Sequence, residues 1–267
     1  MLPTEVDFAT LSPIMAGFLG SLVAGVATGV GAVPIFFRRE WPEQSQIIML
    51  AVAGGIMLAA TVFSLIIPAM DVVVAQSGSE TTAAVTVSSG VILGALCIWL
   101  IHAKVPHEHF VKGPEGGSST ALARQWLFVI AITLHNFPEG MSVGVAFGPG
   151  DFNAGLAVTV GIGLQNMPEG LAVAAALISV GYSRGRAVLF ALLTGLVEPV
   201  GGLIGAAAVS LSDALLPWGL AFSAGAMLFV ISGEVIPETH RKGVEHRATA
   251  CLVLGFVIMM MLDTTLG

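Results

Sequence analysis

Charged residues are scarce in this sequence. Only 10% of its 267 residues are Asp, Glu, Lys or Arg, whereas 55% are hydrophobic. A soluble domain usually carries about a quarter charged residues. The deficit excludes one large water-soluble core, and it indicates a single transmembrane domain over residues 1–267 that is built from spanning helices.

Cysteine is nearly absent, and the N-terminus lacks basic residues. Cys97 and Cys251 both lie in apolar runs, so we interpret them as small buried hydrophobic residues and exclude a disulfide framework. A signal peptide begins with basic residues and has a core of about 7–15 apolar residues. The first apolar run is longer and follows an acidic start, so we expect it to be a retained transmembrane helix.

Eight apolar segments are long enough to cross a bilayer, which takes about 20 helical residues. Numbered in chain order as spans 1 to 8, they cover approximately residues 13–37, 46–74, 83–103, 121–147, 153–179, 186–210, 215–237 and 247–265. The segments between them carry the Pro, Gly, Ser and charged residues typical of loops. The sequence therefore predicts an all-α integral membrane protein.

Lys and Arg are missing from every even-numbered loop and from both termini. All ten occur in or beside the odd-numbered loops, at Arg38, Arg39, Lys104, Lys112, Arg124, Arg184, Arg186, Arg241, Lys242 and Arg247. Basic residues in short loops favour the cytoplasmic side. With eight spans, this pattern predicts that both termini lie on the extracellular or periplasmic side.

Two matching hexads place polar residues in the middle of spans 4 and 5. Span 4 contains HNFPEG at residues 135–140, and span 5 contains QNMPEG at residues 165–170. The first and fifth residues of a hexad share one helix face, and the proline leaves a backbone carbonyl without its helical donor. Since the two spans run in opposite directions, the hexads meet at mid-depth, as the broken helices of many transporters do.

Acidic residues in mid-membrane are costly and normally face an ion, a partner or water. Span 6 adds a third such carboxylate, Glu198, which is followed by Pro199. Imidazole and carboxylate groups together suit a borderline cation such as Zn²⁺, and bridging carboxylates can hold two ions in a binuclear-type site. The candidate metal ligands are His135, Asn136, Glu139, Gln165, Asn166, Glu169 and Glu198.

Further polar residues lie outside this centre. Glu234, Glu238 and His240 near the inner end of span 7 form a candidate exit path for metal, although an ordinary polar helix end explains them equally well. The loop over residues 102–120 contains several histidines, and we expect a solvated loop without a fixed metal site rather than a metal-binding loop.

These motifs resemble those of the ZIP (Zrt/Irt-like) metal transporter family, and most closely its bacterial GufA-type branch. The likeness continues through GGIMLA at residues 54–59, Glu198-Pro199 in span 6 and IPETH at residues 236–240, and it covers all eight spans in order. The resemblance implies a 3+2+3 arrangement of spans, a location in the cell membrane, homodimers and metal import into the cytosol. It also implies an elevator-like movement of the span 4–5 unit.

The resemblance also assigns ligands. It implies a first site formed by His135, Glu139, Gln165 and Glu169. It implies a second site that shares the Glu and Gln residues and adds Asn136, Asn166 and Glu198. Some family members have Asp where this chain has Asn166, so the second site is one negative charge poorer here.

Zn²⁺ is the expected cargo, and Fe²⁺, Mn²⁺, Co²⁺ and Cd²⁺ are further cargoes that the resemblance implies. We expect no resident cofactor and no nucleic-acid partner. Two other functions remain open for such a polar centre: an intramembrane metal-dependent hydrolase and a passive metal-gated channel. The sequence contains no H-E-x-x-H string, and the mirrored hexads serve no evident catalytic purpose, so we expect a transporter and not an enzyme.

Overall fold

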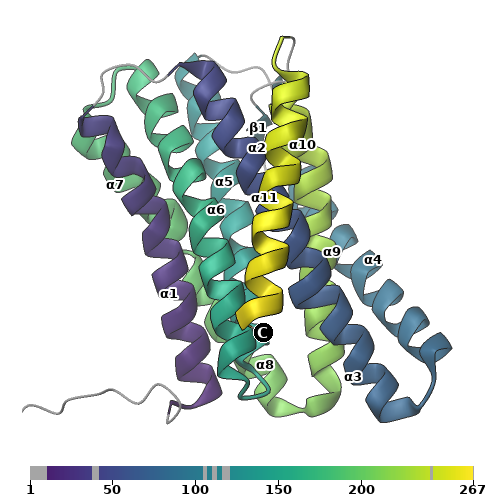
Figure 1. Ribbon diagram of the computed structural model, residues 1–267. Coiled ribbons are helices and arrows are strands. Elements are labelled where there is room, and N and C mark those ends of the chain that lie inside the picture. The colour runs from purple at the N-terminus through teal and green to yellow at the C-terminus, as the bar shows by residue number, and fades with distance from the viewer. Residues whose placement is uncertain are drawn as a thin grey trace, which may run out of the picture.

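The computed structural model describes residues 11–37, 42–104, 107–109, 113–115, 121–240 and 243–266. Within these residues, helix occupies each of the eight ranges predicted as spans (Figure 1). In chain order the elements are α1 (Pro13–Ala32), η2 (Val33–Phe36), α2 (Glu43–Ala60), η3 (Thr61–Ile66), α3 (Ile67–Ser77), α4 (Glu80–Lys104), β1 (His107–His109), β2 (Gly113–Glu115), α5 (Ala121–Phe147), α6 (Phe152–Ser179), α7 (Arg184–Gly195), α8 (Glu198–Leu211), η4 (Asp213–Leu215), α9 (Leu216–Val230), η5 (Ile231–Val235), α10 (Ile236–Thr239) and α11 (Glu245–Leu266).

Within the described ranges, six helical segments are both long and apolar enough to cross a membrane. They are Pro13–Phe36, Ile47–Ser77, Glu80–Ile101, Arg184–Leu211, Leu216–Gly233 and Glu245–Thr265. Helices α5 and α6 have 27 and 28 residues, and the polar residues of their hexads lower their mean hydropathy. The chain is thus a helical, multi-pass membrane protein.

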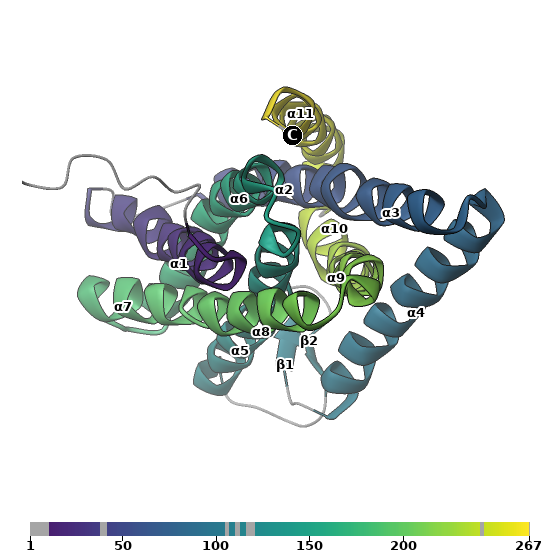
Figure 2. The same ribbon diagram turned by 90° about the horizontal axis from the view of Figure 1, so that it is seen from below.

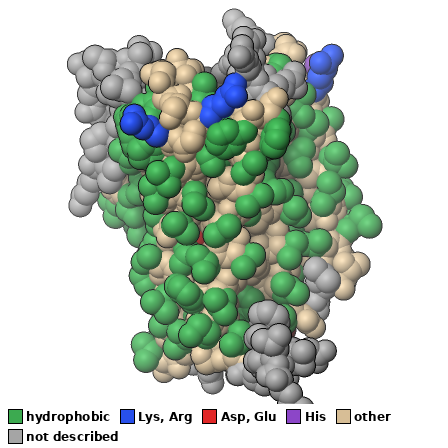
Figure 3. All heavy atoms as spheres, turned by 90° about the vertical axis from the view of Figure 1, so that its left-hand side faces the viewer, with side chains coloured by type: hydrophobic (Ala, Val, Ile, Leu, Met, Phe, Trp, Pro, Cys, Tyr) green, Lys and Arg blue, Asp and Glu red, His purple; other side chains and the backbone are tan. Residues whose placement is uncertain are grey.

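The outer surface is largely apolar. Large hydrophobic side chains are exposed on α1, α4 and α11, including Val23 at 65%, Ile92 at 64% and Leu254 at 55%. Figure 3 shows one face on which hydrophobic side chains cover most of the length and the visible Lys and Arg side chains lie near one end. An apolar surface of this extent in a monomer indicates contact with lipid or another subunit.

The helices pack in two groups around α5 and α6. On one side, α1 contacts α5, α6, α7 and α8, and α5 contacts α8. On the other side, α2 packs against α11, and α4 packs against α9 (Figure 2). Small residues allow the first group to pack closely, since a Cβ on Gly25 of α1 would lie 2.2 Å from the carbonyl oxygen of Gly195 in α7.

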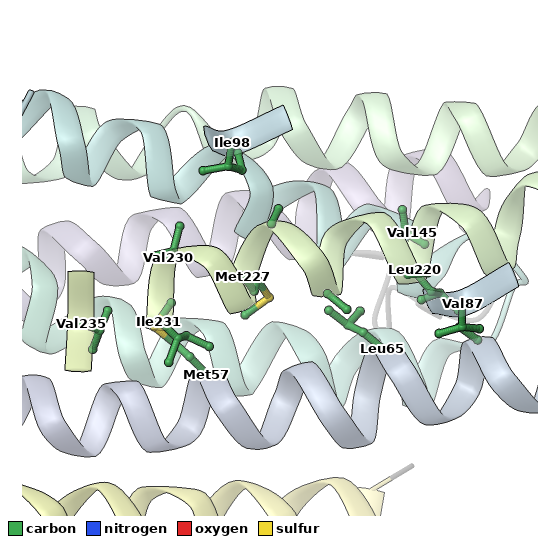
Figure 4. Close-up of a cluster of buried hydrophobic side chains, with 14 of the residues drawn as sticks. Met57, Leu65, Val87, Ile98, Val145, Leu220, Met227, Val230, Ile231 and Val235 are labelled. Carbon is green, nitrogen blue, oxygen red and sulfur yellow. The ribbon is translucent and has the colours of Figure 1, made fainter. Parts of the chain in front are cut away.

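A buried hydrophobic cluster holds α9 in place (Figure 4). It contains Met57 of α2, Leu65 of η3, Ile98 of α4, and Leu220 and Met227 of α9. The cluster reaches α5 through Ser142, whose Oγ lies 3.6 Å from Met227 Sδ. This apolar packing gives α5 one hydrophobic neighbour, while its other sides face α6, α8 and α1.

Several local features differ from the sequence expectations. Spans 2 and 7 each contain a π-helical segment, η3 and η5, that ends just before an Ile-Pro pair. Ser64 in η3 donates a hydrogen bond to Asp263 of α11. Span 6 is broken between α7 and α8. A bulky proline without a backbone donor disturbs the regular ladder in each case.

The segment over residues 102–120 contains two short strands that the sequence analysis did not foresee. Strands β1 and β2 form an antiparallel hairpin that pairs His107 with Glu115. Cys97 and Cys251 are unpaired, as predicted. However, both are half-buried rather than buried, because α4 and α11 lie at the outside of the helix bundle.

Candidate metal site

The structure buries all seven predicted ligands. His135, Asn136 and Glu139 come from α5, Gln165, Asn166 and Glu169 from α6, and Glu198 from the first turn of α8. None is more than 5% exposed, and four are fully buried. So many polar groups in the interior require partners or an ion.

The two hexads meet through Gln165 and Glu139. Gln165 Nε2 donates a hydrogen bond of 2.6 Å to Glu139 Oε1. Glu139 Oε2 and Gln165 Oε1 are buried and have no hydrogen-bond partner among the described residues. A carboxylate oxygen and an amide oxygen, both of which can bind a divalent cation, are therefore left over from this contact.

Asn166 joins three helices. Its Nδ2 donates to Glu198 Oε1 at 2.6 Å and to the backbone oxygen of Ala24 in α1 at 2.8 Å. Only the amide NH₂ group can donate to two acceptors at once, which fixes the orientation of this side chain. The contact with Ala24 was not predicted, because a backbone carbonyl leaves no signal in the residue pattern.

The remaining candidate ligands lie on the same two helices. His135 and Glu139 share a face of α5, and Gln165 and Glu169 share a face of α6, since each pair is four residues apart. Both amide atoms of Asn136 are buried and lack hydrogen-bond partners in the described part of the chain. The centre therefore offers imidazole, carboxylate and amide groups from adjacent helices.

Glycine at the end of each hexad brings other backbones close to the centre. A Cβ on Gly140 would lie 2.1 Å from the carbonyl oxygen of Glu198, and one on Gly170 would lie 1.8 Å from that of Thr28. Real Cβ atoms do not approach so closely, so these two positions require glycine in this packing. The glycines let α5 contact the start of α8, and they let α6 contact α1.

Prolines and a helix break shape the backbone around the centre. Pro138 and Pro168 lie inside α5 and α6, so each removes one helical donor in the turn that carries a ligand pair. Glu198 begins α8 and Pro199 follows it. A helix N-terminus favours a negative charge, so the break between α7 and α8 stabilises the Glu198 carboxylate.

The carboxylates of Glu139 and Glu198 each face an amide N–H group of α6. Within the described residues, no three His, Cys, Asp or Glu side chains are grouped so that they could hold an ion. Binding an ion with the predicted ligands would therefore require side chains to reorient. Rotation of the Gln165 amide, for example, would present its oxygen instead of its nitrogen to an ion beside Glu139.

The predicted exit residues lie on two consecutive elements. Glu234 belongs to η5 and Glu238 to α10, and both side chains lie outside the described part of the structure. His240 follows α10 and is exposed. Its Nε2 lies 3.0 Å from Thr249 Oγ1 of α11, and its Nδ1 lies 2.9 Å from the oxygen of Ile236.

Comparison with known proteins identifies the family. The sequence model described as ZIP Zinc transporter matches residues 104–263, which include both hexads and Glu198. The zinc transporter GufA of Myxococcus xanthus is 51% identical over 94% of this chain and 99% of its own length. The chain is a member of the ZIP family.

Other relatives of this ZIP protein are more distant. The zinc transporter ZIPB of Bordetella bronchiseptica is 46% identical, over 93% of this chain and 81% of its own length. Human zinc transporter ZIP11 is 30% identical, over 96% of this chain and 98% of its own length. The predicted resemblance to the ZIP family, and to its GufA-type branch, is confirmed.

Proposed function

We propose that this ZIP protein imports divalent metal ions, chiefly Zn²⁺, into the cytosol through the buried polar centre of α5, α6 and α8. The observation that carries the proposal is the contact between the hexads, in which Gln165 Nε2 donates to Glu139 Oε1. It places ligand types that suit zinc inside an otherwise apolar bundle. The similarity to proteins named zinc transporters supports the same cargo.

In this proposal the primary ion binds His135, Glu139, Gln165 and Glu169. The ion takes the place of the Gln165 N–H group from which Glu139 accepts a hydrogen bond, and the Gln165 amide turns to present its oxygen. Because the ion replaces a single hydrogen bond, binding and release of the ion at this site require only a local movement of the Gln165 side chain. Asn136, Asn166 and Glu198 form a second polar cluster beside this site.

The amide contacts also lower the cost of burying the carboxylates. An uncompensated carboxylate in a bilayer interior costs several kcal/mol. Hydrogen bonds to charged groups are worth about 1.5–3 kcal/mol, and both Glu139 and Glu198 accept one from α6. In this proposal the same bonds stabilise the carboxylates whenever no ion is bound to them.

The remaining features of the proposal concern the whole protein. It lies in the cell membrane with eight spans in a 3+2+3 arrangement, and both termini are extracellular or periplasmic. Metal crosses by an elevator-like movement of the unit that contains α5 and α6, and leaves past Glu234, Glu238 and His240. Homodimers form, and Fe²⁺, Mn²⁺, Co²⁺ and Cd²⁺ compete as cargo.

Metal-competition uptake into liposomes that contain the purified protein tests this function. We expect zinc uptake that saturates with concentration and is reduced by competing divalent ions. An intramembrane metal-dependent hydrolase would give no flux. A channel would give fast flux that does not saturate, so the same measurement separates the three functions.

A further inference from the structure

Asn166 is held differently from its neighbour Gln165. The amide nitrogen of Gln165 makes one hydrogen bond to a side chain, that of Glu139. The amide nitrogen of Asn166 makes two, to Glu198 on α8 and to the Ala24 carbonyl on α1. Turning the Gln165 amide breaks one contact, whereas turning Asn166 breaks contacts to two helices.

The two oxygen atoms that accept from Asn166 Nδ2 are of the kinds that also bind cations. Glu198 Oε1 and the Ala24 oxygen lie 2.6 and 2.8 Å from this nitrogen, and both are negatively charged or partially so. The two amide hydrogens carry the positive partial charge that these oxygens require. An aspartate at position 166 would instead bring a third oxygen to the same point, and the oxygens would need a cation between them.

We propose that the amide group of Asn166 occupies the place of a second metal ion, so that this transporter loads a single ion beside Glu139. This inference rests on the proposed transport function and deepens it. The second cluster then fixes the start of α8 against α1 and α6 and does not carry cargo. The centre that the resemblance implies as binuclear is then mononuclear, because position 166 carries an amide donor in place of an aspartate.

The surrounding packing keeps the amide in place. Ala24, Asn166 and Glu198 are all 0% exposed. One turn further along α1, a Cβ on Gly170 would lie 1.8 Å from the carbonyl oxygen of Thr28, so the two backbones are in close contact. The contact between α1 and α6 on this side holds the buried Asn166 beside its two acceptors.

Counting bound zinc tests the inference. The full-length protein, stripped of metal with a chelator and placed in nanodiscs, is dialysed to equilibrium against radioactive zinc. We expect one ion per chain in the wild type and two in Asn166→Asp. The double variant Asn166→Asp, Glu198→Gln restores one carboxylate and one amide, and we expect it to bind one ion again.

Glu198→Gln provides a second variant that keeps an acceptor for Asn166. If Asn166 replaces the second ion, this variant still binds one ion. Two ions in the wild type that fall to one in Glu198→Gln would overturn the inference, while saturable uptake would still support transport. A count of one in a folded Asn166→Asp protein would also overturn it. A wild type that binds no zinc and takes up none would instead refute the proposed function.

Discussion

At the scale of single residues, the centre combines carboxylates with amides that donate hydrogen bonds to them. Glu139 and Glu198 sit on different helices, and each accepts a hydrogen bond of 2.6 Å from a neighbouring residue of α6. The hexads and Glu198 could be predicted as a polar centre, because charged residues in apolar spans stand out. The pairing of each amide with one carboxylate could not be predicted, since it depends on the distance between the helices.

The Glu139→Gln variant tests the cost of a buried carboxylate. It keeps an oxygen that can accept from Gln165 and removes the charge, so we expect the zinc-free protein to unfold at a higher temperature. Zinc should raise the unfolding temperature of the wild type by binding to the folded state, and it should leave that of the variant unchanged. Thermal unfolding with and without zinc measures both effects. A lower unfolding temperature for the zinc-free variant would show that the carboxylate stabilises the empty protein.

The exit residues give a second prediction at this scale. Replacing Glu234, Glu238 and His240 together with alanine should slow zinc uptake, because metal leaving the centre loses its transient ligands. The zinc affinity of the central site should change little, because the three residues lie on η5, on α10 and directly after α10. Uptake rates and equilibrium binding of the same preparation check this. Unaltered uptake would favour an ordinary polar helix end.

At the scale of helices, glycines and prolines position the candidate ligands. Gly140 and Gly170 let α5 and α6 touch α8 and α1, and the break before Glu198 places this residue at a helix start. Pro199 hints at that break in the sequence. The π-helical segments η3 and η5 were not foreseen, since the proline that follows each one indicates a disturbed helix but not which kind of helix replaces it. The role of α1 was also missed, because it acts through the carbonyl of Ala24.

Alanine at Gly140 or Gly170 should separate the helices around the centre. Each new Cβ would lie about 2 Å from a backbone oxygen, and overpacking of this kind costs about 1–3 kcal/mol. This outweighs the gain of up to about 1 kcal/mol in helix propensity. We expect a lower unfolding temperature and weaker zinc binding in both variants.

Gly185→Ala is the matched control for these substitutions. Gly185 lies in the first turn of α7, and no atom lies within 4 Å of a Cβ built there. Its unfolding temperature and zinc affinity should equal or exceed those of the wild type. Equal behaviour of Gly140→Ala and Gly185→Ala would contradict the close packing of α5 on α8.

At the scale of the whole molecule, the direction of the helices and the positions of the basic residues indicate the same orientation in the membrane. The helix starts of α2, α5, α7 and α11 lie at one end of the bundle (Figure 1), which is the end where Arg184, Arg186 and Arg247 occur. Trp126 and Tyr182 also lie at this end and share a hydrogen bond of 3.0 Å. Amphipathic aromatic residues are typical of either membrane interface, and the positive charge favours the cytoplasmic side for this one.

Cysteine labelling tests this orientation. After Cys97 and Cys251 are replaced with serine, a cysteine at Ser79 or Asn153 should react with an impermeant reagent in intact cells. A cysteine at Ser118 or Ser183 should react only after the membrane is permeabilised. External labelling at Ser183 would contradict the predicted topology. Position 118 lies outside the described residues, so its result depends on the charge pattern alone.

The central claim is that metal crosses through the contact between the two hexads. Zinc uptake by the double variant Glu139→Ala, Glu169→Ala in liposomes tests it most directly, since the variant removes one carboxylate from each hexad. The wild type and Gly185→Ala, reconstituted at the same density, provide the controls. We predict that saturable uptake is abolished in the double variant and retained in both controls. Full zinc uptake by a folded double variant would show that the transport site lies elsewhere.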